Sequence, residues 1–190
     1  NFSQSRVVEI HTEAQDLVAM LPKDALTKTM IRQAIDALNA VSRSLEHLKA
    51  EMRTLAAQLP EYPVVMAMHG VGDSLGPQLI AEIGDVTRFT HRNAITAFAG
   101  VDPGADQSGM HNAKSTRTSK SGPPALRKAL FLVMDCLLKT MPEDDPVYRF
   151  MDKKRAEGKP YLVYMTAGAN KFLRIYYGKV KEHLASLEEN

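Results

Sequence analysis

The chain has 190 residues, which is enough for one substantial domain plus an appended element, since domains typically span about 100 to 200 residues. Its 44% hydrophobic and 24% charged residues exclude a disordered chain, and with a formal net charge of only +2 any basic surface must come from local clustering. No run of about 18 uncharged apolar residues is present, and the single cysteine fits a reducing compartment. We therefore expect no membrane partner and a cytoplasmic location.

Two amphipathic helices are predicted at the start of the chain, over residues 5–21 and 25–59. The second contains no glycine or proline and ends before Pro60. Apolar or small residues recur along it in alternating steps of three and four: Ile31, Ala34, Leu38, Val41, Leu45, Leu48, Met52, Leu55 and Leu59. This heptad seam predicts a coiled-coil helical hairpin or dimer stalk over residues 1–60, through which the chain forms a homo-oligomer.

A glycine turn, Gly70-Val71-Gly72, connects the apolar segment 64–68 to a predicted helix over 75–83. It matches the helix-hairpin-helix pattern, in which backbone N–H groups at a helix N-terminus bind a DNA phosphate without reading sequence. A Gly-x-Gly connector also joins many helix pairs for steric reasons alone. Both interpretations stay open at this point.

After a predicted helix over 92–99, residues 101–124 show no sustained periodicity and are rich in glycine, proline, serine, threonine and lysine. A loop of this length inside a compact domain is typically functional or disordered. Basic residues within it and just after it predict a grip on the DNA backbone: Lys114, Arg117, Lys120, Arg127 and Lys128. The alternative is a solvated loop whose charges bind nothing.

Three further helices are predicted over 125–140, 145–157 and 161–187, and no strand is expected. The acids Glu143, Asp144 and Asp145 follow a proline and precede a helix, which favours helix capping over a metal site. The aromatic and basic residues of the last helix could grip RNA or form half a core and half a solvated face. The expected fold is all-α: a long coiled-coil hairpin, then a helix-hairpin-helix-containing domain over 61–190 with a long functional loop.

Several linked motifs occur in one order: Met68 to Gly72, Leu79 to Asp85, Arg88-Phe89, Ala97 to Pro103, Ser108-Gly109, Lys120 to Gly122 and Leu126 to Leu130. Over about residues 59–173 this order resembles the C-terminal domain of the Piv/MooV-type insertion-sequence transposases, the IS one-ten family. The resemblance implies a recombinase with a split active site. In that arrangement an N-terminal RuvC-like domain binds Mg²⁺ through a DEDD set of acids, and a serine of the C-terminal domain becomes covalently joined to DNA.

By position in the motif, the resemblance makes Ser108 the nucleophile. It also implies subunit assembly through the coiled coil and a bridge RNA that chooses donor and target DNA. Since the acidic domain is not part of these 190 residues, we expect no cofactor here and no activity from the chain alone. The chain departs from the family's usual Ile-Pro-Gly at Met68-His69-Gly70 and from its usual Gly-Asn at Gly122-Pro123.

Two other functions remain open on the sequence. One is a non-enzymatic helix-hairpin-helix module that binds DNA without any role for Ser108. The other is a plain helical assembly module whose loop is incidental.

Overall fold

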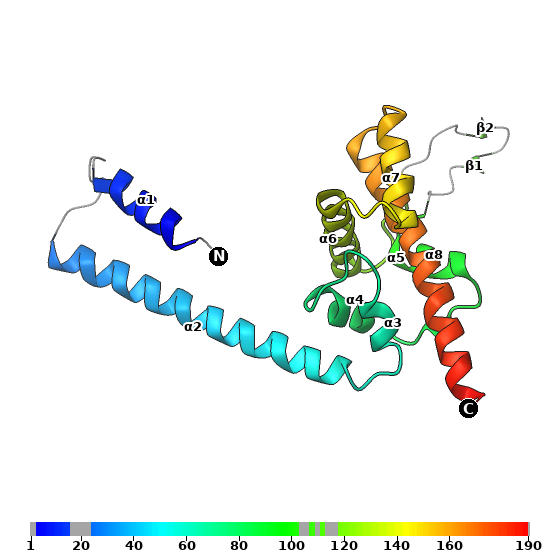
Figure 1. Cartoon of the computed structure of the whole chain (residues 1–190), viewed down its shortest axis with the longest axis horizontal. Coiled ribbons are helices and arrows are strands. Elements are labelled where there is room, and N and C mark those ends of the chain that lie inside the picture. Colours follow the sequence, from blue (N-terminus) through cyan, green and yellow to red (C-terminus); the bar gives the residue numbers. More distant parts are fainter. Residues whose placement is uncertain (1–2, 16–23, 103–106, 109–110, 113–117, 190) are drawn as a thin grey trace. The chain divides into compact units, whose positions relative to one another are not determined.

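A computed structural model describes residues 3–15, 24–102, 107–108, 111–112 and 118–189 of the chain. Eight α-helices form this described part, together with a short 3-10 helix and one minimal strand pair. The elements in order are α1 (Gln4–Gln15), α2 (Ala25–Ala56), α3 (Tyr62–Met66), α4 (Leu75–Ile83), η1 (Val86–Arg88), α5 (Arg92–Ala99), β1 (Gln107–Ser108), β2 (His111–Asn112), α6 (Pro124–Thr140), α7 (Pro146–Ala156) and α8 (Tyr161–Glu188). The predicted all-α fold class is confirmed, and Figure 1 shows the elements in sequence order.

The chain divides into two units, residues 1–48 and 49–190, and the boundary falls inside α2. The last turns of α2 belong to the second unit, since Ala56 is only 6% exposed and joins its core. In addition, Arg53 forms an ion pair of 3.5 Å with Asp73, just ahead of α4. The far end of the predicted 1–60 stalk is therefore packed into the helical domain.

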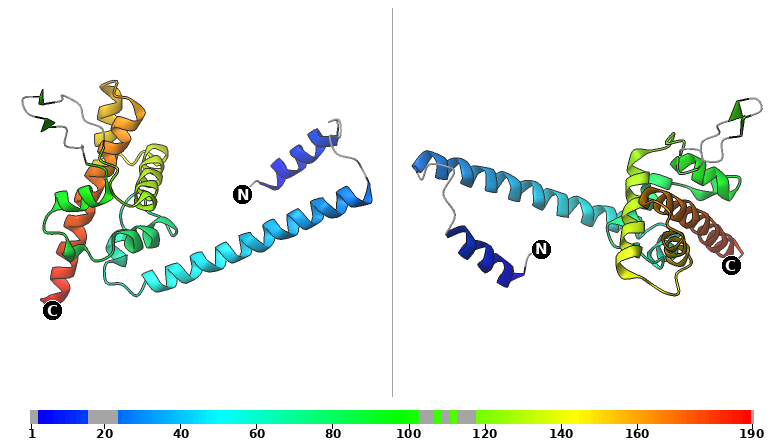
Figure 2. Two further views of the ribbon diagram at one scale, coloured as in Figure 1. Left: turned by 180° about the vertical axis from the view of Figure 1, so that it is seen from behind. Right: turned by 90° about the horizontal axis from the view of Figure 1, so that it is seen from above.

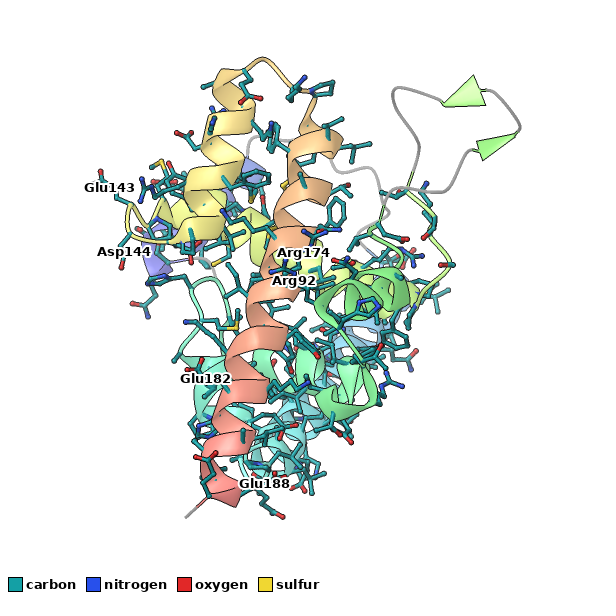
Figure 3. The ribbon with its side chains drawn as sticks, turned by 90° about the vertical axis from the view of Figure 1, so that its right-hand side faces the viewer. Arg92, Glu143, Asp144, Arg174, Glu182 and Glu188 are labelled. Carbon is teal, nitrogen blue, oxygen red and sulfur yellow. The ribbon has the colours of Figure 1, made fainter. Side chains whose placement is uncertain are left out.

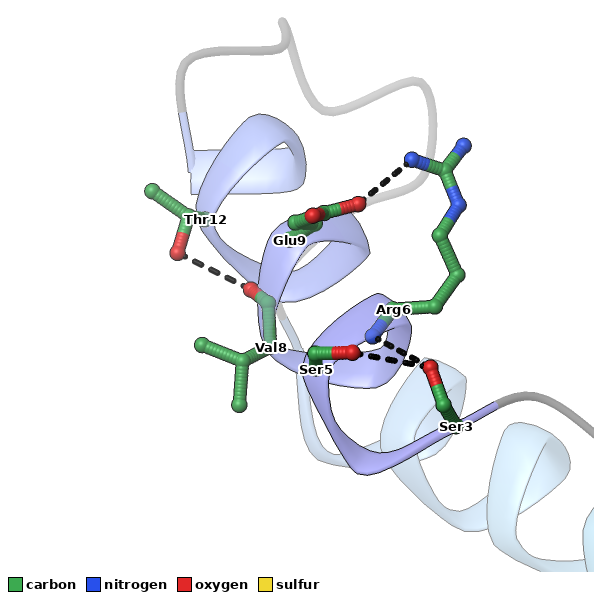
Figure 4. Close-up of polar contacts among 6 residues, drawn as sticks. All are labelled: Ser3, Ser5, Arg6, Val8, Glu9 and Thr12. Carbon is green, nitrogen blue, oxygen red and sulfur yellow. Dashed lines mark hydrogen bonds and ion pairs between the residues drawn. The ribbon is translucent and has the colours of Figure 1, made fainter.

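In the first unit, local polar contacts stabilise the helix ends. In α1, Arg6 pairs with Glu9 at 2.8 Å, and the hydroxyl of Ser3 accepts a hydrogen bond from the Arg6 backbone N–H (Figure 4). At the start of α2, the Asp24 carboxylate accepts a 2.7 Å hydrogen bond from the backbone N–H of Thr27, which lowers the pKa of Asp24. Short-range contacts of this kind are what an isolated helix needs at its ends.

The heptad seam of α2 is exposed. Leu38 is 66% exposed and Leu45 is 50% exposed, and the other large apolar residues of the seam are similarly open. An apolar stripe with this spacing is suited to pack against another helix.

The second unit is organised around α8, which contacts α3, α5, α6, α7 and η1 (Figures 1 and 2). Its buried face carries Phe172 and Tyr176, and these join the buried leucines of α4 and α6 in one hydrophobic core. Close approach of α7 to α8 depends on Gly168, where an added Cβ would lie 2.5 Å from the sulfur of Met151. The prediction that the last helix is half core and half solvated face fits this arrangement.

Helix boundaries follow the capping residues. Asp145 accepts hydrogen bonds from the backbone N–H groups of Val147 and Tyr148, at 2.8 and 2.7 Å, so the predicted capping role of this acidic cluster holds for Asp145. Gly100 ends α5 in the left-handed conformation, with φ of 65°.

Two expectations need correction. Helix α2 ends at Ala56 and not at residue 59, because the chain tightens into i→i+3 turns in which Gln58 and Leu59 donate to Leu55 and Ala56. The structure also contains strands, which the sequence did not predict. Gln107 pairs with Asn112, and Ser108 with His111, in an antiparallel ladder too short to produce an alternating pattern.

Candidate nucleic-acid interface

The predicted glycine turn packs against α6. Gly70 has φ of 78°, and a Cβ added there would lie 3.0 Å from the carbonyl oxygen of Val133 and 3.1 Å from Cγ of Leu137. Val71 is half-buried against the core, whereas Gly72 is exposed with nothing within 4 Å of its Cβ position. Gly70 therefore has a steric reason to be glycine, and Gly72 is the member of the turn that faces open space.

The helices on either side of this turn are unequal. Before it, α3 has five residues and makes one turn, and after it α4 has nine. Ser74 precedes α4 without a side-chain hydrogen bond to the helix, and Gly76 donates to the carbonyl of Gly72 at 2.9 Å. The geometry has the order helix, turn, helix, while its use as a DNA-binding hairpin stays a prediction.

The long loop begins and ends at one place, which we call the loop neck: Gly100, Asp102, Ser119 and Gly122. Ser119 donates its backbone N–H to the Asp102 carbonyl at 3.2 Å and its hydroxyl to the Asp102 carboxylate at 2.6 Å. One residue further, the N–H of Lys120 donates to the carbonyl of Gly100 at 3.2 Å. A pair of backbone bonds and one side-chain bond thus join the described residues at the two ends of the long loop.

Gly100 and Gly122 allow the two chain segments of the loop neck to pack closely against each other. A Cβ on Gly100 would lie 2.8 Å from the backbone nitrogens of Ser121 and Gly122. A Cβ on Gly122 would overlap the carbonyl oxygen of Phe98. Because these neighbours are backbone atoms, neither position can accept a side chain without moving the neck.

Arg127 ties the neck to α6. Its guanidinium donates to the carbonyl oxygen of Gly122 and, at 3.4 Å, to that of Ala99. The sequence predicted a DNA contact for Arg127, and the structure places this half-buried side chain inside the neck, with part of its donor capacity already used.

A cleft of about 300 Å³ opens beside the loop neck and brings three of the predicted cations together. Its lining comprises Gly100, Val101, Thr118, Lys120, Arg127, Lys128, Phe131, Leu162 and Thr166. Among the described residues of this lining there is no acid, and Thr118 and Thr166 contribute hydroxyl groups. Lys120 holds φ of 51°, a strained value for a lysine, and its position is fixed by the bond to Gly100. We call this the basic cleft.

The structure describes only some of the remaining residues that the sequence predicted for the site. Ser108 lies in β1, where its backbone pairs with His111, and its side chain is outside what the structure describes. Lys114 and Arg117 also lie outside the described residues. The glycine turn lies against α6 at Val133 and Leu137, and neither the turn nor these two residues are among those that line the basic cleft.

His91 and His69 each contact a residue outside the long loop. Nδ1 of His91 accepts the backbone N–H of Asn93 at 3.2 Å and so caps α5. Nδ1 of His69 lies 3.4 Å from the Asp145 carboxylate. Both histidines therefore have structural partners.

Among the described residues, no group of three or more His, Cys, Asp or Glu side chains gathers to hold a metal ion. Within the same residues, no helix combines the length and apolar character needed to cross a bilayer.

The loop neck was missed by sequence reasoning. Asp102 belonged to a motif already noted, but nothing in the sequence connects it to Ser119, seventeen positions later. The Gly100 and Gly122 pair was the available signal, since each glycine stands at an edge of the aperiodic segment.

Cations clustered in one cleft, on a chain of low net charge, are an electrostatic feature typical of nucleic-acid-binding surfaces. Residues 62–149 match the model of the Transposase IS116/IS110/IS902 family. The segment 62–149 is thus similar to the transposase domain of the IS116/IS110/IS902 family, which agrees with the resemblance seen in the chain's motifs.

The chain is also similar to a protein of another insertion element. Over 166 residues the chain is 22% identical to the uncharacterized 42 kDa protein of insertion element IS900 from Mycobacterium paratuberculosis. That similarity covers 87% of this chain and 41% of the relative, so the chain spans about two fifths of the relative's length.

Proposed function

We propose that this chain supplies the serine nucleophile and the DNA-binding surface for strand exchange of an insertion sequence, as part of a longer transposase. Ser108 is the nucleophile. The observation that carries the proposal is that the segment holding Ser108 is closed by the loop neck directly beside the basic cleft, within a transposase family domain.

The reaction requires the protein to make a serine reactive and to stabilise the charge that develops on the phosphate. A serine hydroxyl is a weak nucleophile, and the attacked phosphate develops charge that nearby cations must stabilise. Oγ of Ser108 forms a bond to phosphorus as the bond from phosphorus to the leaving deoxyribose oxygen breaks, and that oxygen takes up a proton. Lys120 and Lys128, exposed at the basic cleft, are the described side chains best placed to hold the DNA backbone during this exchange.

The loop neck supports the proposal through positioning. A nucleophile must reach its target within a narrow range of distances and angles, and a long loop with free ends does not provide this. Backbone bonds from Ser119 and Lys120, together with the Arg127 contacts, fix both ends of the loop to α5 and α6.

Assembly through the heptad seam is part of the same proposal. Ile31, Leu38 and Leu45 are 45%, 66% and 50% exposed, and a second copy of this chain would cover them. A bridge RNA as guide comes from the family resemblance. RNA extracted from the purified complete protein, if it mapped to the element's own non-coding end, would support that part.

The test is trapping of the covalent protein–DNA adduct in the complete protein with Ser108→Ala. We expect the adduct to disappear while duplex binding stays within about twofold, because only one hydroxyl is lost. The matched control is Ser121→Ala, a change of the same chemistry at the exposed end of the neck. An adduct formed by Ser108→Ala would remove Ser108 from the mechanism and favour the non-enzymatic DNA-binding module.

A further inference from the structure

An open groove between α7 and α8 has a strongly basic lining. It measures about 400 Å³ and is formed by Pro146, Arg149, Phe150, Lys153 and Lys171. Three of these five residues are cations and none is acidic, so we call it the α7–α8 basic groove. It shares no residue with the basic cleft beside the loop neck.

The cations of this groove are not neutralised. Among the described residues, no carboxylate lies within ion-pair distance of Arg149, Lys153 or Lys171, whereas neighbouring Lys154 is paired with Glu157 at 2.9 Å. Unpaired cations on one surface repel each other and favour an anionic partner.

The local field reaches the neighbouring acid. A hydrogen bond from Lys154, followed by the charges of Lys154, Lys153 and Lys159, lowers the pKa of Glu157 at the end of α7. Lys153 and Lys159 thus add to the effect of Lys154 on this carboxylate.

One aromatic ring in the groove contacts cations from both α7 and α8. The ring of Phe150 lies 4.8 Å from the ammonium of Lys171 and 5.8 Å from that of Lys154, so it fixes cations from both helices. Arg149 and Lys153 are one helical turn apart on α7, about 6 Å along the helix axis. That separation is of the same order as one or two phosphate steps of a DNA strand, whose axial spacing is about 3.4 Å.

Asp145 and Asp152 are neighbours in sequence of groove residues, but neither lines the groove. Figure 3 shows Glu143 and Asp144 on the connection ahead of α7, and Glu182 and Glu188 toward the C-terminal end of α8, with Arg174 near the middle of that helix. The positive charge is thus concentrated on α7 and the N-terminal half of α8.

We propose that the α7–α8 basic groove binds the phosphodiester backbone of duplex DNA, as a second contact separate from the one beside the serine loop. Single-stranded nucleic acid is held mainly by bases stacked on open aromatic faces. Phe150 is the only aromatic residue of the lining, it is half-buried, and two ammonium groups already contact its ring. What the groove offers is point charges on a rigid surface, which suits phosphates in a regular duplex.

This inference goes beyond the proposed function and rests on it only in taking DNA as the substrate. The family match ends at residue 149, so most of the groove lies outside the matched segment. The groove does not depend on Ser108 or on the loop.

The experiment measures binding of the chain to a fluorescent 30-base-pair duplex of random sequence by anisotropy, from low to moderate salt. The test variant carries Arg149→Gln, Lys153→Gln and Lys171→Gln. The matched control carries Lys28→Gln, Arg32→Gln and Arg43→Gln, which removes the same charge at exposed sites on α2. Thermal melts by circular dichroism confirm that both variants fold.

We expect the groove variant to bind at least about tenfold more weakly and the slope of log affinity against log salt to fall by about two to three, since each lost phosphate contact removes about 0.9. Equal weakening by the control, an unchanged slope in the groove variant, or no duplex binding by the parent chain would each overturn the inference. A single-stranded RNA that loses more affinity than the duplex would overturn it in favour of RNA.

A third variant separates this inference from the proposed function. Lys120→Gln with Lys128→Gln removes charge from the basic cleft alone. If that variant loses duplex binding while the groove variant keeps it, the α7–α8 contact is excluded and the proposed function stands. If the groove variant loses binding while the cleft variant keeps it, the second contact stands and the DNA role of the basic cleft is excluded.

Discussion

Replacing Gly70 with alanine tests the steric role of the glycine turn. Gly70 has φ of 78°, and a left-handed backbone costs an ordinary residue about 1 to 2 kcal/mol. The new Cβ would lie 3.0 Å from the carbonyl oxygen of Val133 and 3.1 Å from Leu137, and overpacking of this kind typically costs about 1 to 3 kcal/mol. The expected loss is therefore about 2 to 5 kcal/mol in the free energy of unfolding.

At about 2 to 4 °C per kcal/mol for a chain of this size, the melting temperature should fall by roughly 4 to 20 °C in calorimetry or circular dichroism. Gly72→Ala is the matched control, because nothing lies within 4 Å of its Cβ position and its φ is not positive. That variant should melt within about 2 °C of the parent or slightly above it. If Gly70→Ala melted no lower than Gly72→Ala, the reasoning about packing against α6 would be refuted.

Three further outcomes follow from single positions. Gly122→Ala should open the loop neck, because its Cβ overlaps the Phe98 carbonyl, and amide hydrogen exchange at Ser119 should accelerate; unchanged protection there would contradict the neck. Asp145→Ala should lower the free energy of unfolding by about 1 to 2 kcal/mol in urea titrations by removing the cap of α7, with Asp145→Asn losing less; equal losses would argue against capping. Met141→Gly should stabilise the chain by about 1 kcal/mol, because Met141 is 56% exposed and adopts φ of 49°; a lower urea midpoint would show that its side chain has a use not seen here.

The helices were predictable because their signals are local. Each predicted helix is present where the structure describes the chain, and α4 and α5 have the expected bounds. Periodic apolar residues and nearby prolines or glycines are sufficient for this, since both act within a few positions. The exposed seam of α2 was likewise visible in the heptad spacing.

The arrangement of the site was not predictable in the same way. Asp102 and Ser119 are joined across a long aperiodic segment, and no periodic signal survives over that distance. The position of Arg127, with its guanidinium turned to backbone carbonyls, depends on how α6 packs against the end of α5. A count of cations along the sequence could identify Lys120 and Lys128 as neighbours of the loop, but could not separate an exposed lysine from an arginine used inside the neck.

The same limit applies to the α7–α8 basic groove. Its lining comes from two helices, and only their packing brings Lys171 to Phe150. The basic residues of the last helix are visible in the sequence, but the sequence pattern does not show that they lie beside those of α7.

The proposed function depends on Ser108 as the residue that becomes joined to DNA. Mass spectrometry of the trapped protein–DNA adduct tests this directly. The complete protein is incubated with its element's end, the DNA is digested, and the peptide that carries the nucleotide remnant is sequenced. We expect the modification on the hydroxyl of Ser108, within the segment closed by the loop neck. A nucleotide remnant on any other residue would contradict the assignment of the nucleophile and of the loop that holds it.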